Sequence, residues 1–305
     1  MHLKQTLKHG TPQRARLYIR RANRLRWMTK AKVLRQHGAG PWEGRPLRRA
    51  RYVLADPEID TFTYPVANLT EMSELLSEVL EHPADELQGY LDEALADPEL
   101  GPRLSRDVGP GAIYMKRRPP LPAHHLAAWA LIRACKPKLV VETGILEGLG
   151  SRTMLCALHL NSKEGRGGRL ISFDVLPGAG RKLVPKRLRS AWEPIYEPTP
   201  EALARHLEGL EVDFFLHDSV QEYDHLVAEV DAMLPFMAPG GTLMTVAGWT
   251  GLLDQLAEEL RGRSRTFRER PLDHFYSGRT LSWMRLPRDY AGTRPGAVPE
   301  LLAER

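Results

Sequence analysis

The chain has 305 residues, 42% of them hydrophobic and 27% charged, with a formal net charge of +5 at pH 7. This length can bury a full core, and the hydrophobic share is ordinary for a soluble protein. Neither a run of about 18 apolar residues nor a secretory leader is visible, so we expect a cytoplasmic protein. The two cysteines, Cys135 and Cys156, lie in apolar stretches, which favours free thiols over a disulfide.

The positive charge is concentrated in the first 51 residues. This arm holds fifteen Lys or Arg and one acid, Glu43, for a net charge of +14, whereas the rest of the chain carries −9. Apolar residues recur at helical spacing between Thr11 and His37, which predicts a basic amphipathic helix. Such an arm suits an anionic membrane surface, where the protein would be peripheral, or an acidic partner. The alternative is a solvated, partly disordered extension, and nucleic acid is the least favoured partner.

Residues 52–121 have the pattern of a small helical cap region. Thr70 is placed to cap a helix with Met72 and Leu76 on its apolar face, and a second helix is expected over 84–95. A proline-rich stretch then marks a boundary, because consecutive prolines cannot continue a helix. The predicted segments are the arm at 1–51, the cap region at 52–121, a ligand-binding domain at 122–286 and a tail at 287–305.

A predicted helix from His124 to Cys135 leads into an apolar strand that begins at Leu139. A turn follows in which glycines let the backbone bend tightly and approach a ligand. These glycines are Gly144, Gly148 and Gly150. Ser151 then opens a helix whose free N–H groups favour a carboxylate or phosphate. The order of strand, glycine turn and helix predicts a nucleotide-binding loop.

Two later strands end in polar side chains. The strand over 169–174 ends at Asp174, and the strand over 212–219 delivers His217 and Asp218 to its carboxyl end. Open α/β sheets bind ligands at the carboxyl ends of their strands, so these side chains are expected to face a ligand. The alternatives are structural roles, in which Asp218 caps the next helix and His217 is a hydrogen-bonded core histidine.

The remaining elements predict an α/β fold with helices on both faces of a mostly parallel sheet. The last two strands have no room for a crossover helix between them and should pair as an antiparallel hairpin. These elements are a helix starting at Thr199-Pro200-Glu201, a helix over 221–237, a strand over 242–246, a helix over 252–260 and strands over 265–270 and 280–285.

The glycine turn has the spacing E-x-G-x-x-x-G-x-G rather than the G-x-G-x-x-G of dinucleotide-binding enzymes. This spacing is similar to motif I of the class I S-adenosylmethionine-dependent methyltransferases. Asp174 and the Pro239-Gly240-Gly241 passage match the same family in the same order. The resemblance covers about residues 122–286 and implies a Rossmann-like class I methyltransferase sheet with an N-terminal helical extension.

Three passages more closely resemble a bacterial subgroup of small-molecule and sugar O-methyltransferases of secondary metabolism, related to the cephalosporin hydroxylase and macrolide-sugar methyltransferase group. They are residues 141–151, 164–174 and 217–223. Relatives often carry a histidine where this chain has Gln221, and the metal-dependent ones place an acid where it has Ala247-Gly248-Trp249. Since one carboxylate is a poor magnesium site, the sequence favours transfer without a divalent metal, with Asp218 as the ligand if a metal is used.

The resemblance also implies how S-adenosylmethionine is held. Glu142 is expected to face the methionyl ammonium, the Gly144 to Ser151 loop its carboxylate, and Asp174 the ribose hydroxyls. The full expected set is Glu142, Thr143, Gly144, Gly148, Gly150, Ser151, Asp174 and His217.

The chemistry follows from the cofactor. A sulfonium methyl group is already activated, so the protein must align the acceptor, exclude water and, for a hydroxyl, remove a proton. His217 and Asp218 are the predicted catalytic residues. A looser set is expected to reach the acceptor: Tyr114, His124, His125, His274 and Tyr276.

The favoured function is O-methylation of a hydroxyl on a small natural product or sugar, by an enzyme for which a homodimer is the default state. One alternative is N-methylation of a small molecule. Another is a catalytically weak S-adenosylmethionine-binding protein that acts through its basic arm, suggested by Gln221 and by the missing acid after the fifth strand.

Overall fold

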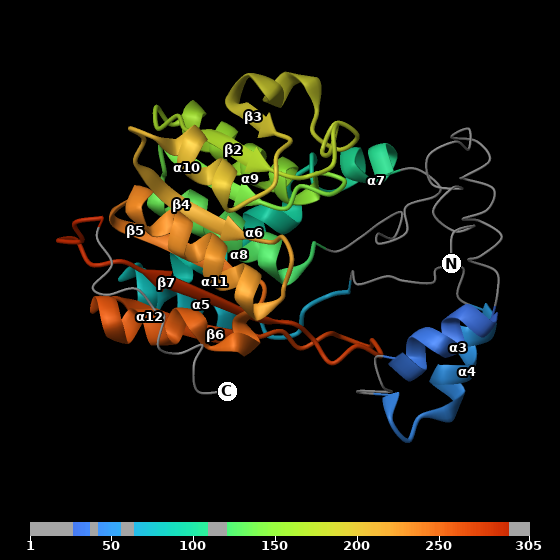
Figure 1. The fold of residues 1–305 in the computed structure, drawn as a ribbon. Coiled ribbons are helices and arrows are strands. Elements are labelled where there is room, and N and C mark those ends of the chain that lie inside the picture. Colours follow the sequence, from blue (N-terminus) through green and yellow to red (C-terminus); the bar gives the residue numbers. More distant parts are fainter. Residues whose placement is uncertain (1–26, 37–41, 56–63, 109–120, 293–305) are drawn as a thin grey trace. The chain divides into compact units, whose positions relative to one another are not determined.

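The computed structural model describes residues 27–36, 42–55, 64–108 and 121–292 (Figure 1). The chain divides into two compact units that interleave along the sequence. The larger draws its described residues from 68–100, 123–269 and 279–292; the smaller draws them from the segments within 1–67, 101–122 and 270–278. Most of the predicted basic helix lies outside the described residues.

A seven-stranded sheet with the order β3-β2-β1-β4-β5-β7-β6 forms the centre of the larger unit. The first five strands run parallel, while β7 is antiparallel to both β5 and β6. This arrangement confirms the predicted methyltransferase-like fold and its terminal hairpin. The strands are β1 (Leu139–Thr143), β2 (Arg169–Phe173), β3 (Trp192–Ile195), β4 (Val212–His217), β5 (Met237–Thr245), β6 (Arg263–Arg268) and β7 (Thr280–Arg285).

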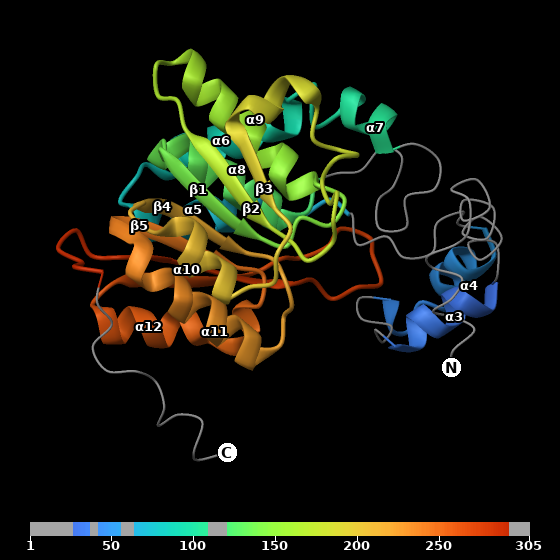
Figure 2. The same ribbon diagram turned by 45° about the horizontal axis from the view of Figure 1, so that its top comes forward.

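Helices cover both faces of this sheet. Figures 1 and 2 show α10, α11 and α12 on one face and α5, α6, α8 and α9 on the other. On the first face, apolar side chains of the three helices pack with those of the strands in one buried cluster. The helices are α5 (Leu69–Leu80), α6 (Ala84–Ala96), α8 (Ala123–Cys135), α9 (Leu149–Lys163), α10 (Glu201–Leu207), α11 (Tyr223–Met233) and α12 (Leu252–Leu260).

Strand burial follows the sequence pattern. Every residue of β1 is buried, as expected for an apolar strand covered on both faces. Three strands differ from the prediction, and one of them, β6, spans Arg263–Arg268 rather than 265–270. β5 begins at Met237 rather than residue 242, because the Pro-Gly-Gly passage continues the strand through a register shift opposite Val212 and Phe214. β3, a four-residue edge strand that contains Pro194, was not predicted.

Three helix starts were predicted at the wrong residue. Asn68, not Thr70, is the N-cap of α5. Gly148 is the N-cap of α9, so Ser151 lies inside the helix, where its hydroxyl donates to a carboxylate. Pro200 is the N-cap of α10, and the Thr199 hydroxyl instead donates to Glu229. Thr70 lies inside its helix rather than before it. The hydroxyls of Ser151 and Thr199 donate to carboxylates instead of capping a helix.

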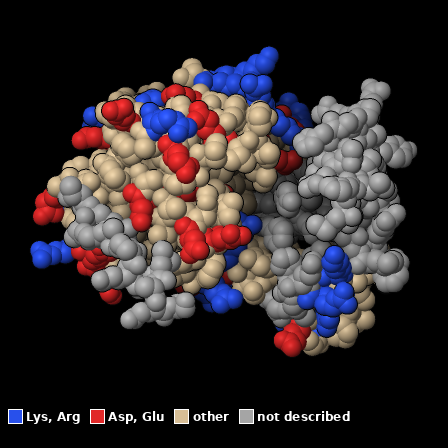
Figure 3. Space-filling view, viewed as in Figure 1, with Lys and Arg blue, Asp and Glu red and all other residues tan. Residues whose placement is uncertain are grey.

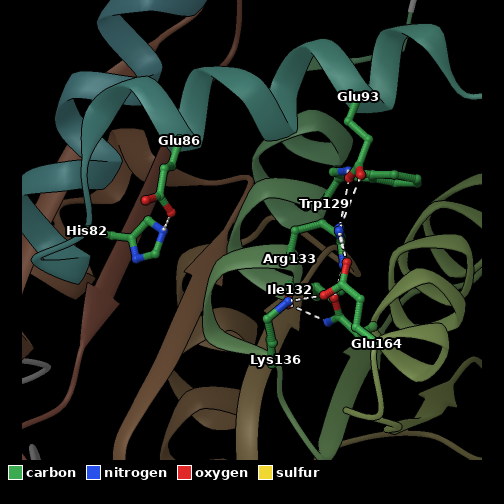
Figure 4. Close-up of polar contacts among 9 residues, drawn as sticks. His82, Glu86, Glu93, Trp129, Ile132, Arg133, Lys136 and Glu164 are labelled. Atoms are coloured by element: carbon green, nitrogen blue, oxygen red, sulfur yellow. Dashed lines mark hydrogen bonds and ion pairs between the residues drawn. The ribbon is translucent and has the colours of Figure 1, made fainter.

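A buried arginine joins three helices on one face of the sheet (Figure 4). Arg133 of α8 is 5% exposed and donates from Nε to Glu93 of α6 at 2.8 Å and from Nη2 to Glu164, next to α9, at 2.6 Å. The Trp129 indole donates to the same Glu93 carboxylate. Charge-assisted bonds of this kind are stronger than neutral ones, so they fix the position of α8, which carries His124 and His125.

The smaller unit contains α3 (Trp27–Gln36), α4 (Pro46–Ala55) and α7 (Pro102–Val108). Leu34, Trp42, Tyr52 and Phe275 form its apolar cluster. The arginines of α4 are exposed, and Figure 3 shows basic side chains at the surface of this unit.

Both cysteines are free thiols, as predicted. Across the described ranges, no helix has the length and apolarity that a membrane span requires.

Candidate active site

The glycine loop between β1 and α9 lies in close contact with two neighbouring backbone segments. Gly144 and Gly148 have φ of +90° and +93°, a region that L-residues rarely adopt. A Cβ on Gly144 would lie 2.3 Å from the carbonyl oxygen of Asp218, and one on Gly148 would lie 2.6 Å from the Cα of Gly180. Both positions therefore require glycine, as the sequence predicted.

Asp174, directly after β2, binds the same loop. Its Oδ2 accepts hydrogen bonds from the amides of Ile145 and Leu146, both at 2.9 Å, and its Oδ1 accepts one from Leu176 at 2.8 Å. The carboxylate thereby fixes the conformation of the glycine loop. The contact of Asp174 with ribose hydroxyls stays a prediction. Its hydrogen bonds to the loop are a further contact that was not predicted.

Glu142 places a buried carboxylate behind the loop. Its side chain is 1% exposed, and its Oε2 accepts hydrogen bonds from Ser151 at 2.5 Å and Ser172 at 2.8 Å. Its Oε1 is buried with no hydrogen-bond partner among the described residues. Burial raises the pKa of Glu142 to about 8, and the two serine hydroxyls offset part of this shift. The site thus holds an acceptor atom suited to a cationic or N–H-bearing ligand.

His217, at the end of β4, belongs to a second buried network. Its side chain is fully buried, with Nδ1 3.2 Å from the Thr245 hydroxyl and Nε2 3.5 Å from a carboxylate oxygen of Glu229. Burial lowers the pKa of His217, and the nearby Glu229 and Asp218 offset part of that effect. This geometry matches the core-histidine alternative more closely than an exposed base, while its catalytic role stays a prediction.

Glu229 of α11 is the centre of that network and was not among the predicted site residues. It is fully buried and accepts hydrogen bonds from four side chains besides its approach to His217. The donors are Thr143, Thr199, Ser219 and His225. The signal was available, because Glu229 falls between Leu226 and Met233 on the apolar face of its helix. The predicted cofactor residue Thr143 thus directs its hydroxyl at Glu229.

Removing the Glu229 carboxylate is expected to leave several buried donors without an acceptor. We expect Glu229→Ala to lower the free energy of unfolding by about 3 kcal/mol. Asp224→Ala, an exposed acid on the same helix, is the control and should change it by less than about 1 kcal/mol. Urea unfolding followed by circular dichroism measures both, and equal losses in the two variants would contradict the assignment of Glu229 as the hub.

The third cluster joins Asp218 to the histidine pair at the start of α8. His124 Nε2 lies 3.5 Å from Asp218 Oδ2, and the ring centroids of His124 and His125 are 4.0 Å apart. The two histidines are 4% and 5% exposed, and burial lowers the pKa of both well below the ordinary value. Burial raises the pKa of Asp218, and His125, Arg279 and His217 offset part of that shift. The sequence placed these residues in separate sets, whereas the structure brings them together.

The other predicted acceptor residues are not part of this cluster. His274 and Tyr276 belong to the smaller unit, where the His274 ring packs against Phe275 and Tyr64 with centroids 4.4 and 4.8 Å apart. Tyr114 lies outside the described residues. Their contact with an acceptor stays a prediction.

Comparison with known proteins identifies part of the larger unit. Residues 141–245, from β1 through β5, match the family model of a methyltransferase domain. None of the curated proteins compared with the chain matches it.

Several solved structures are similar at low identity. The O-methyltransferase from Bacillus cereus in complex with SAH shares 14% identity over 71% of this chain and 97% of its own, with a TM-score of 0.45. TomG from Streptomyces achromogenes, an O-methyltransferase of tomaymycin synthesis in complex with SAM, shares 13% over 71% and 96%, with a TM-score of 0.44. The SAH-bound methyltransferase PaMTH1 from Podospora anserina shares 16% over 67% and 94%, with a TM-score of 0.43.

Proposed function

Because the chain carries a methyltransferase domain, we propose that it transfers the methyl group of S-adenosylmethionine to a hydroxyl of a small natural product or sugar. The observation that carries this proposal is the buried Glu142 carboxylate, whose Oε1 has no partner among the described residues. It lies behind a glycine loop at the carboxyl end of β1, where sheets of this type bind ligands.

The residues present fit the cofactor. S-adenosylmethionine carries a cationic ammonium, which suits the unpaired oxygen of Glu142. A side chain on Gly150 would lie 2.6 Å from that oxygen, so this glycine keeps the approach to it open. The Gly144 to Gly148 turn, fixed by Asp174, lets a ligand lie close to the backbone. When bound, S-adenosylmethionine supplies an activated methyl group.

The rest of the chemistry belongs to the chain. A hydroxyl acceptor must be aligned with the methyl group and must lose its proton. Asp218 is the partly exposed carboxylate at the end of β4, and we assign it to the acceptor hydroxyl. His217 is buried behind it and orients the end of β4 through Thr245 and Glu229. A neutral amine can attack the methyl group without first losing a proton, whereas a hydroxyl needs a base. The acid–base groups near the end of β4 therefore favour a hydroxyl acceptor.

The test separates binding from turnover. S-adenosylhomocysteine should bind in calorimetry while NADH does not, and S-adenosylhomocysteine should form from S-adenosylmethionine with hydroxyl-bearing acceptors. Asp218→Asn is expected to keep binding within about threefold and to lose at least about 100-fold in turnover. The matched control Asp224→Asn, an exposed acid on α11, should retain both. No binding by the intact protein would overturn the proposal, and methylation of amines alone would replace it with N-methyl transfer.

A further inference from the structure

His124 and His125, at the start of α8, and Asp218, directly after β4, form a cluster of polar side chains. His124, His125 and Asp218 each offer one donor atom, and these three atoms all lie within 4.8 Å of one another. The histidines are adjacent at the start of α8, while Asp218 follows β4, so the cluster depends on the tertiary structure. Its members are two nitrogen donors and one carboxylate.

We propose that His124, His125 and Asp218 bind a divalent first-row transition ion of the zinc or iron(II) type. The inference rests on the proposed function, since it specifies how Asp218 acts on the acceptor hydroxyl. Two imidazoles and one carboxylate are a common ligand set for such ions, with positions left open for another ligand. Mg²⁺ and Ca²⁺ fit less well, because they prefer oxygen ligands.

Distances agree with a shared ion. Bond lengths of about 2.0–2.2 Å in a tetrahedral site separate neighbouring ligand atoms by about 3.4 Å. The 3.5 Å between His124 Nε2 and Asp218 Oδ2 meets this spacing without movement. The widest pair, at most 4.8 Å apart, must close by up to about 1.4 Å, which a side-chain rotation supplies.

Each histidine of the cluster also has one buried ring nitrogen without a protein partner in the described part of the chain. Nδ1 of His124 and Nδ1 of His125 are both buried with no hydrogen-bond partner among the described residues. Buried polar groups in folded proteins are normally satisfied, and two adjacent exceptions call for an explanation. His124 faces Asp218 with its other nitrogen, Nε2, so an ordered water molecule rather than the ion would have to satisfy its Nδ1.

Charge and protonation support the same reading. Both imidazoles are buried, and the neutral form of the ring is the one that coordinates a metal. Arg279 also lowers the pKa of both rings, and its positive charge opposes a bound cation. Affinity must therefore come from direct coordination by the three ligands rather than from the local field. An ion here supplies Lewis acidity to a hydroxyl oxygen.

Metal binding can be measured without any acceptor. The untagged full-length chain is first treated with a chelator and then titrated with Zn²⁺ in competition with a chromophoric chelator. Co²⁺ is titrated separately and followed by its visible absorption, which reports coordination geometry. We expect one equivalent to bind. His124→Asn, His125→Asn and Asp218→Asn should each weaken binding by about 100-fold or more, whereas His206→Asn, a histidine of α10 outside the cluster, should leave it unchanged.

Two readouts keep the outcomes distinct. Circular dichroism melting shows whether each variant is folded, and any one folded variant of the three suffices for the comparison. Binding that persists in folded His124→Asn or His125→Asn, or no stoichiometric binding by the intact chain, overturns the site. Calorimetry with S-adenosylhomocysteine on the chelator-treated protein tests the proposed function separately: cofactor binding without metal binding removes only this inference.

Discussion

Gly144→Ala is expected to abolish cofactor binding and to lower the free energy of unfolding by about 4 kcal/mol. An added Cβ would lie 2.3 Å from the carbonyl oxygen of Asp218 and 2.8 Å from the amide nitrogen of Ser219. Both are backbone atoms, which cannot turn aside as a flexible side chain can. The segment after β4 must therefore move, and Asp218 moves with it. The glycine loop and Asp218 then lose the relative position that the proposed reaction needs.

A matched variant separates this collision from backbone strain. Gly165 has φ +78°, yet a Cβ there would meet nothing within 4 Å. Gly165→Ala should therefore cost only about 1 kcal/mol, the strain of the left-handed conformation alone, and should leave cofactor binding intact. Urea unfolding and calorimetry with S-adenosylhomocysteine measure both quantities. If the two variants lose the same amount, the tight approach of the glycine loop to β4 does not control the site.

Glu142→Gln is expected to weaken S-adenosylhomocysteine binding by about tenfold to 100-fold while making the protein more stable at neutral pH. The wild-type side chain is buried, and burial raises its pKa from 4.5 to about 8. The folded state therefore holds a proton that the unfolded state releases between these two pH values. Stability is fully present below about pH 4.5 and falls as the pH rises toward 8.

The size of this effect follows from the shift. At pH 7 the raised pKa costs the wild-type protein roughly 3 kcal/mol, whereas glutamine does not ionise. The difference in unfolding free energy, Glu142→Gln minus wild type, should then rise from its baseline near pH 4.5 by roughly 3 kcal/mol at pH 7. The baseline itself includes the cost of the buried amide, which is independent of pH.

Denaturant unfolding of both proteins at several pH values, after chelator treatment, measures this difference. Calorimetry in two buffers of different ionisation enthalpy tests the link to the cofactor. The wild type should release a proton when the ammonium binds beside Glu142, and the variant should not. A difference in stability that does not change with pH would show that Glu142 ionises normally in the folded protein.

Local sequence determined most elements of the larger unit, with β3 the exception. The apolar run of β1 and the glycines after it are consecutive, so their pattern alone indicates a buried strand and a tight turn. The same holds for the terminal hairpin, because the short connection between β6 and β7 leaves no room for a parallel crossover. Glu142, Asp174 and Asp218 were predicted as site residues because each lies at or next to the end of a strand.

Only the tertiary structure decided which side chains bind one another. Asp174 was expected at the ribose, but it also fixes the glycine loop through backbone amides that approach it only in the folded sheet. Glu229 collects donors from one strand, two loops and its own helix, and no spacing along the chain encodes that meeting. A hydrogen-bond partner is chosen by packing across elements, which short-range periodicity does not describe.

The histidine pair illustrates the same limit at the proposed metal site. His124 and His125 were expected only to reach over the acceptor, and Asp218 was judged a poor magnesium ligand because it stood alone in the sequence. The parallel pairing of β1 with β4 and the packing of α8 beside α9 bring the three donor atoms together. Sequence determined the chemistry of each group, and the fold determined that they share one site.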